Sequence, residues 1–175
     1  MVDNDTDRAQ QRRWGGAMIV AAWVGALALL TLFFNDWLAQ ERNPNTALST
    51  RIGADGLREA VLERNRFGHY LAAGTINGRA VTFIVDTGAS DVSVPAHLAD
   101  EMGLQRGAAQ VYSTANGPAT NYATRLARVA LGSIALENVR ASINPNVDHD
   151  EVLLGMSFLR HLELVQRGNT LTIRQ

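Results

Sequence analysis

The feature that most constrains this chain is an uncharged run of 20 residues, GGAMIVAAWVGALALLTLFF, at 15–34. At a rise of about 1.5 Å per residue, a helix of this length crosses a hydrocarbon core of about 30 Å. A helix buried in a soluble core usually carries one polar face, and this run has none. The sequence therefore predicts a single transmembrane helix at 15–34, preceded by a short tail at 1–14.

The run also differs from a cleaved signal peptide, whose apolar region is typically about 7–15 residues long. It ends in FFNDW at 33–37, with no small-residue cleavage site behind it. An uncleaved anchor is therefore favoured. Three arginines precede the span and only Arg42 follows it closely, so the positive-inside rule predicts a cytoplasmic N-terminus. Residues 35–175 would then lie outside the inner membrane, in a periplasm.

Charge and cysteine content exclude several classes of function. The chain has 16 Lys+Arg against 17 Asp+Glu, so no basic excess points to nucleic acid. It has no cysteine, which excludes disulfides, thiolate metal sites and a cysteine nucleophile.

The segment after the apolar run is predicted to be a linker, 35–66. Within it, DGLREAVLERNR at 55–66 places Leu57, Val61 and Leu62 at helical spacing. This pattern fits either a short amphipathic helix or a partly ordered linker. An exposed linker is also where self-cleavage would release a soluble domain.

From residue 67 the pattern changes to short strands and turns. Asn77-Gly78 lies between two strand-like runs, which is a strong signal for a type I′ hairpin turn. Further strands are predicted near 108–115, 119–131 and 134–143, followed by a brief apolar run at 152–155, a helical turn at 158–161 and a hairpin within 162–173. Many short strands with frequent turns predict an all-β barrel or sandwich at 67–175.

Asp86 follows the apolar strand VTFIV at 81–85 and precedes Thr87 and Gly88. A carboxylate at the end of an apolar strand is costly unless it is hydrogen-bonded or shares a proton. Two such turns placed face to face would bring two carboxylates together with one shared proton. One carboxylate could then take a proton from water while the other protonates a substrate carbonyl, which hydrolyses an amide without a covalent intermediate.

The sequence resembles the retropepsin-like aspartic proteases, in particular a bacterial membrane-anchored group. The resemblance rests on Asp-Thr-Gly-Ala-Ser at 86–90, on a hydrophobic-hydrophobic-Gly run at 153–155 and on YSTANGPATNY at 112–122, where the family has its flap hairpin. It covers about 67–175. Only one Asp-Thr-Gly is present, so the resemblance implies a closed half-pepsin barrel that acts as a homodimer on a protein or peptide substrate, without cofactor or metal.

The resemblance assigns roles to individual residues. Asp86, Thr87 and Gly88 would be catalytic, and the substrate would contact Ala89, Ser90, Asp91, Ala115, Asn116 and Gly117. The chain departs from the viral pattern because Gly155-Met156-Ser157 stands where retroviral enzymes carry Gly-Arg-Asn. The salt bridges tied to that arginine, and dimerisation through viral-type terminal strands, are therefore not implied.

Other interpretations are weaker. The run Asp-His-Asp-Glu at 148–151 could be read as a metal cluster, but a solvated acidic loop fits it better because no second cluster has suitable spacing. Ser157 lacks the second glycine of a nucleophile elbow. The main rival is a non-catalytic module of the same fold, which would bind peptides or serve for dimerisation.

Overall fold

A computed structural model describes residues 4–53, 56–114 and 117–175. The chain divides into two compact units, Met1–Gln40 and Glu41–Gln175. The first consists of most of helix α1 (Asn4–Arg42). Within α1, Gly16–Arg42 is long and apolar enough to cross a membrane by length and composition. The predicted apolar helix at 15–34 therefore lies inside a longer helix.

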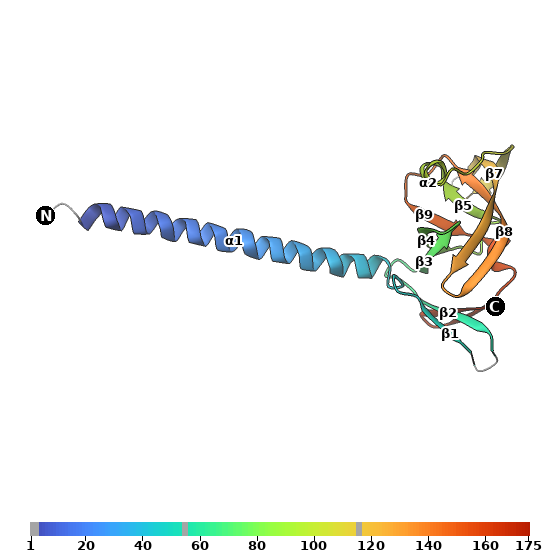
Figure 1. Cartoon of the computed structure of the whole chain (residues 1–175), viewed down its shortest axis with the longest axis horizontal. Helices are drawn as coiled ribbons and strands as arrows, with labels where there is room; N and C mark the ends of the chain where they lie inside the picture. The colour runs from blue at the N-terminus through green and yellow to red at the C-terminus, as the bar shows by residue number, and fades with distance from the viewer. Residues whose placement is uncertain (1–3, 54–55, 115–116) are drawn as a thin grey trace. The chain divides into compact units, whose positions relative to one another are not determined.

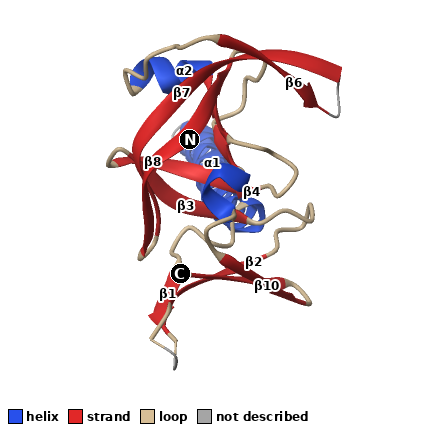
Figure 2. Ribbon diagram, turned by 90° about the vertical axis from the view of Figure 1, so that its right-hand side faces the viewer, coloured by secondary structure: helices blue, strands red, loops and turns tan. Residues whose placement is uncertain are grey.

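The second unit is built around a seven-stranded sheet (Figures 1 and 2). The strand order is β3-β4-β9-β5-β8-β7-β6, and an additional pairing between β3 and β7 closes the sheet into a barrel. The strands are β3 (Leu71–Ile76), β4 (Arg79–Val85), β5 (Val92–Pro95), β6 (Ala109–Thr114), β7 (Gly117–Leu131), β8 (Ile134–Asn144) and β9 (Glu151–Leu154). The predicted all-β barrel is confirmed.

Local sequence accounts for much of this barrel. Asn77 and Gly78 both have positive φ, 51° and 85°, as the type I′ turn between β3 and β4 requires. Inward-facing residues such as Phe83, Leu126 and Ile143 are fully buried in one continuous core. Short helix α3 (Met156–Leu159) follows β9 and overlaps the predicted turn. Strand β5 and helix α2 (Ala96–Glu101) were not predicted.

A second sheet has four antiparallel strands in the order β1-β2-β11-β10. These are β1 (Ser49–Ile52), β2 (Arg58–Glu63), β10 (Glu163–Arg167) and β11 (Thr170–Arg174). The β10–β11 hairpin confirms the predicted one within 162–173. Ala60 and Leu62 of β2, with Leu171 and Ile173 of β11, bury their side chains in the barrel core. Figure 2 shows this sheet at the end of the barrel opposite α2.

The helix considered for 55–66 is wrong, because Arg58–Glu63 form strand β2 paired with β11. Ala60 and Leu62 alternate toward the core at strand spacing, and the partner strand satisfies their backbone groups. The linker is likewise largely part of the fold. Asn45 is buried, and its Nδ2 donates to the carbonyls of Glu63 and Leu71 at 2.8 and 2.7 Å. The compact unit therefore begins at Glu41 rather than at residue 67.

Candidate active site

Asp86 directly follows β4, which runs parallel to β9. Its backbone N–H donates to the carbonyl of Leu154 at 3.2 Å, so the end of β9 anchors the turn. The Asp86 carboxylate accepts the backbone N–H of Gly88 at 2.8 Å. A side chain at position 88 would place its Cβ 3.2 Å from the Asp86 Oδ1, so glycine suits this close approach. Asp86 is half-buried, whereas Thr87 and Gly88 are exposed.

The loop after Asp86 rests on Gly155. The N–H groups of Met156 and Ser157 donate to the carbonyls of Ala89 and Ser90, at 2.8 and 3.0 Å. A Cβ at Gly155 would lie only 2.6 Å from the Ala89 carbonyl oxygen and would also overlap the backbone of Asp91. The hydrophobic-hydrophobic-Gly run at 153–155 thus packs beneath the loop that follows Asp86.

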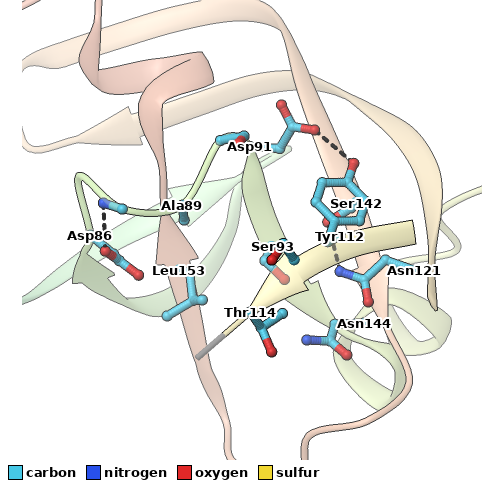
Figure 3. Close-up of a pocket in the computed structure, with 13 residues that line it drawn as sticks. Asp86, Ala89, Asp91, Ser93, Tyr112, Thr114, Asn121, Ser142, Asn144 and Leu153 are labelled. Carbon is cyan, nitrogen blue, oxygen red and sulfur yellow. Dashed lines mark hydrogen bonds between the residues drawn. The ribbon is translucent and has the colours of Figure 1, made fainter. Parts of the chain in front are cut away.

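A pocket of about 370 Å³ opens beside Asp86 (Figure 3). One wall is β6 of the β6–β7 hairpin, which contributes Tyr112, Ser113 and Thr114. The remaining lining residues come from the loop after β4 and from the barrel strands: Asp86, Gly88, Ala89, Ser90, Asp91, Ser93, Asn121, Ser142, Asn144 and Leu153. The hairpin therefore stands over the pocket where the sequence predicted a flap.

Asp91 is 5% exposed, and both of its carboxylate oxygens have partners. Arg140 Nε donates to Oδ1 at 2.6 Å, and the Tyr112 hydroxyl donates to Oδ2 at 2.8 Å. Burial, together with the hydrogen bond to Asp91, raises the pKa of Tyr112 above its ordinary value. The phenol therefore stays protonated as a donor through neutral pH. This contact ties the hairpin strand to the loop after Asp86.

Ser157 has a structural position. Its buried Oγ accepts the N–H of Val92 at 3.0 Å and donates to the carbonyl of Arg140 at 2.7 Å. In the acidic loop at 148–151, Asp150 Oδ1 lies 2.9 Å from His97 Nε2. No group of three metal-ligating side chains occurs among the described residues.

The predicted site residues are only partly brought together. Asp86, Gly88, Ala89, Ser90 and Asp91 line the pocket, while Thr87 lies exposed next to it. Gly117 begins β7 and its carbonyl accepts the Thr114 hydroxyl at 2.7 Å, but it does not line the pocket. Ala115 and Asn116 lie outside the described residues.

Five pocket residues on the strands themselves were not predicted as site residues: Ser93, Asn121, Ser142, Asn144 and Leu153. Four of them are polar residues on strands, which is a weak signal, and Leu153 is apolar and was named only as part of the hydrophobic-hydrophobic-Gly run. The pairing of β7 with β8 is needed to show that Asn121, Ser142 and Asn144 lie at the same pocket.

The closed barrel, the Asp-Thr-Gly turn held by Leu154 and Gly155, and the overhanging hairpin define the class of retropepsin-like aspartic proteases. The chain belongs to the family described as "gag-polyprotein putative aspartyl protease", whose model matches residues 72–161.

A solved structure agrees with this assignment, and two uncharacterized curated proteins are related in sequence. A retropepsin-like aspartic protease from Rickettsia conorii is 26% identical, with a TM-score of 0.55, over 73% of this chain and 94% of that one. An uncharacterized protein in the cobV 5′ region of Sinorhizobium sp. is 33% identical over 69% of this chain and 54% of its own length. One from Rickettsia prowazekii (strain Madrid E) is 29% identical over 69% and 50%. The chain thus spans about half the length of these curated relatives.

Proposed function

We propose that this chain is a membrane-anchored aspartic endopeptidase that acts as a homodimer, with Asp86 contributed by each protomer. The observation that carries the proposal is the Asp86 turn: its carboxylate borders a pocket large enough for a peptide side chain, under a hairpin. The residues next to it, Thr87 and Gly88, are exposed. An exposed turn with one carboxylate is half of a water-activating pair.

A two-fold axis beside Asp86 would complete the pair. Two carboxylates in hydrogen-bonding range cannot both ionise readily, so they share one proton. The ionised Asp86 would then remove a proton from water as the water attacks the scissile carbonyl, and the protonated Asp86 would donate to the carbonyl oxygen. Their roles exchange when the amine leaves, so no cofactor or metal takes part in the proposed reaction.

Helix α1 supports a membrane anchor, because Gly16–Arg42 has the length and composition of a span. With the arginine bias of the sequence, the proposed topology places the N-terminus in the cytoplasm and Glu41–Gln175 in a periplasm. Anchoring two chains in one membrane raises their effective concentration, which favours pairing of the half-sites.

The direct test compares the full chain in detergent micelles with Asp86→Asn, using an unfolded protein substrate from acidic to neutral pH, with and without pepstatin. Asparagine keeps the shape of Asp86 but cannot act as the base. We expect cleavage to fall at least about a hundredfold while the melting temperature and the dimer persist. Equal cleavage by both proteins would refute the role of Asp86. A folded dimer that never cleaves would favour the peptide-binding module instead.

Mixing the two proteins tests the shared site. If protomers exchange between dimers and each active dimer needs two intact Asp86 residues, the activity per wild-type chain is proportional to the wild-type mole fraction. A ninefold excess of Asp86→Asn should then reduce the activity of a constant amount of wild type to roughly a tenth. If the added variant left the activity of the wild type unchanged, the proposal of a site shared by two protomers would be refuted.

A further inference from the structure

Asn121 carries an unpaired acceptor in the wall of the pocket beside Asp86. This residue of β7 is 4% exposed, and its Nδ2 donates to the hydroxyl of Ser142 on β8 at 3.3 Å. Its Oδ1 has no hydrogen-bond partner among the described residues. A buried carbonyl without a donor is costly, and most such groups are paired. An orphan acceptor in a pocket wall therefore points to a donor on the ligand.

Asn144 offers the complementary donor. Its Oδ1 accepts both the backbone N–H of Asn146, at 2.9 Å, and that residue's side-chain amide, at 3.2 Å. These bonds orient the Asn144 amide and leave its Nδ2 without an acceptor within the described part of the chain. The register pairs Tyr122 with Ile143, so Asn121 and Asn144 occupy the next position on β7 and β8. Figure 3 shows both across the pocket from Asp86.

We propose that this pocket binds a carboxamide side chain of the substrate, glutamine or asparagine, next to the scissile bond. The substrate NH₂ would donate to Asn121 Oδ1, and its carbonyl would accept from Asn144 Nδ2. The inference rests on the proposed function, because it needs a peptide positioned at Asp86.

Charge and polarity in the wall disfavour other side chains. Both oxygens of Asp91 are occupied by Arg140 and Tyr112, so Asp91 offers no unpaired oxygen to a substrate lysine or arginine. A substrate carboxylate would face the Asn121 Oδ1. An apolar side chain would leave the amide groups of Asn121 and Asn144 without partners, and sites built to hydrogen-bond a group reject analogues that lack it.

The experiment first maps cleavage sites of the full chain in detergent on an unfolded protein digest by mass spectrometry. Glutamine and asparagine should be enriched at one position flanking the scissile bond. A peptide from the strongest site is then compared with its Gln→Met or Asn→Leu analogue. We expect kcat/KM to favour the carboxamide peptide about tenfold, and Asn121→Leu to abolish this ratio while it still cleaves the apolar peptide.

Two further variants sharpen the test. Asn144→Leu removes the donor from a less buried position and should also reduce the ratio. Thr124→Val lies on the same strand as Asn121 but lines a different pocket, so it should leave the ratio unchanged. No carboxamide enrichment, an unchanged ratio in Asn121→Leu, or an equal loss for both peptides would overturn the proposal.

The inference remains testable if the chain proves not to cleave. The same two peptides, carrying a fluorescent label, are then titrated with the full-chain Asp86→Asn protein and followed by anisotropy. About tenfold tighter binding of the carboxamide peptide, lost in the Asp86→Asn, Asn121→Leu double variant, supports the pocket even though catalysis has failed. Equal affinities, or no binding of either peptide, would refute it.

Discussion

Replacing Gly155 with alanine tests whether packing beneath the loop after Asp86 sets the position of Asp86. Real Cβ atoms essentially never approach another heavy atom closer than 3.0 Å. The new Cβ would lie 2.6 Å from the Ala89 carbonyl oxygen and 2.8 Å from the Asp91 carbonyl carbon. Both contacts are backbone atoms of the loop, so no side-chain rotation relieves them. The Cβ comes closest to a third backbone atom, the Asp91 carbonyl oxygen, so the loop must move by about 0.8 Å to restore that separation.

Overpacking of this kind lowers the free energy of unfolding by about 1–3 kcal/mol. For a unit of this size, we expect the melting temperature to fall by about 3–10 °C. Since a displacement of 1 Å at a reacting group can cost about a hundredfold in rate, a shift of nearly that size predicts a loss of kcat/KM of roughly tenfold to a hundredfold.

Calorimetry of the full chain is the suitable stability assay, because Trp14, Trp23 and Trp37 all lie in α1 and their fluorescence does not report on the barrel. Gly25→Ala is the control: its Cβ would meet no atom within 4 Å and it lies in α1, so neither the melting temperature of the unit Glu41–Gln175 nor cleavage should fall. A Gly155→Ala protein with wild-type melting temperature and cleavage would refute the argument that Gly155 sets the loop position.

Two other predictions follow from the contacts of the second unit. Tyr112→Phe removes the bond to Asp91 and should cost about 1 kcal/mol of stability. Because the folded pKa of Tyr112 is raised, its stabilising contribution is complete below the unfolded pKa of about 10 and is lost as pH rises through the folded value. Denaturation from pH 8 to 11 should therefore show a steeper alkaline loss in wild type than in the variant, and identical profiles would contradict this. A fragment 67–175 loses β2, so Leu171 and Ile173 lose their neighbours Ala60 and Leu62; we expect it to be unfolded by NMR, whereas 41–175 gives dispersed spectra. A folded 67–175 fragment would show that β2 is dispensable.

Local signals explain which features could be predicted from the sequence. The Asn77-Gly78 turn needs positive φ at two adjacent positions, and few residue pairs supply it. The strands after this turn either alternate apolar with polar residues or are apolar throughout. Each is short and is bounded by turn residues. The prediction failed at 58–63, where Leu57, Val61 and Leu62 fit a helix while Ala60 and Leu62 fit a strand. Pairing with β11, more than 100 residues away, decided between the two.

The sequence by itself determined the apolar helix, the all-β class of the remainder and the Asp-Thr-Gly turn at 86–88, because each depends on residues adjacent in the chain. Only the tertiary structure showed that Asp91 is held by Arg140 and Tyr112, and that Asn121 and Asn144 form one wall of the pocket. These contacts join separate strands, and their geometry depends on strand register. A shift of one residue would turn Asn121 to the other face of β7 and remove the wall.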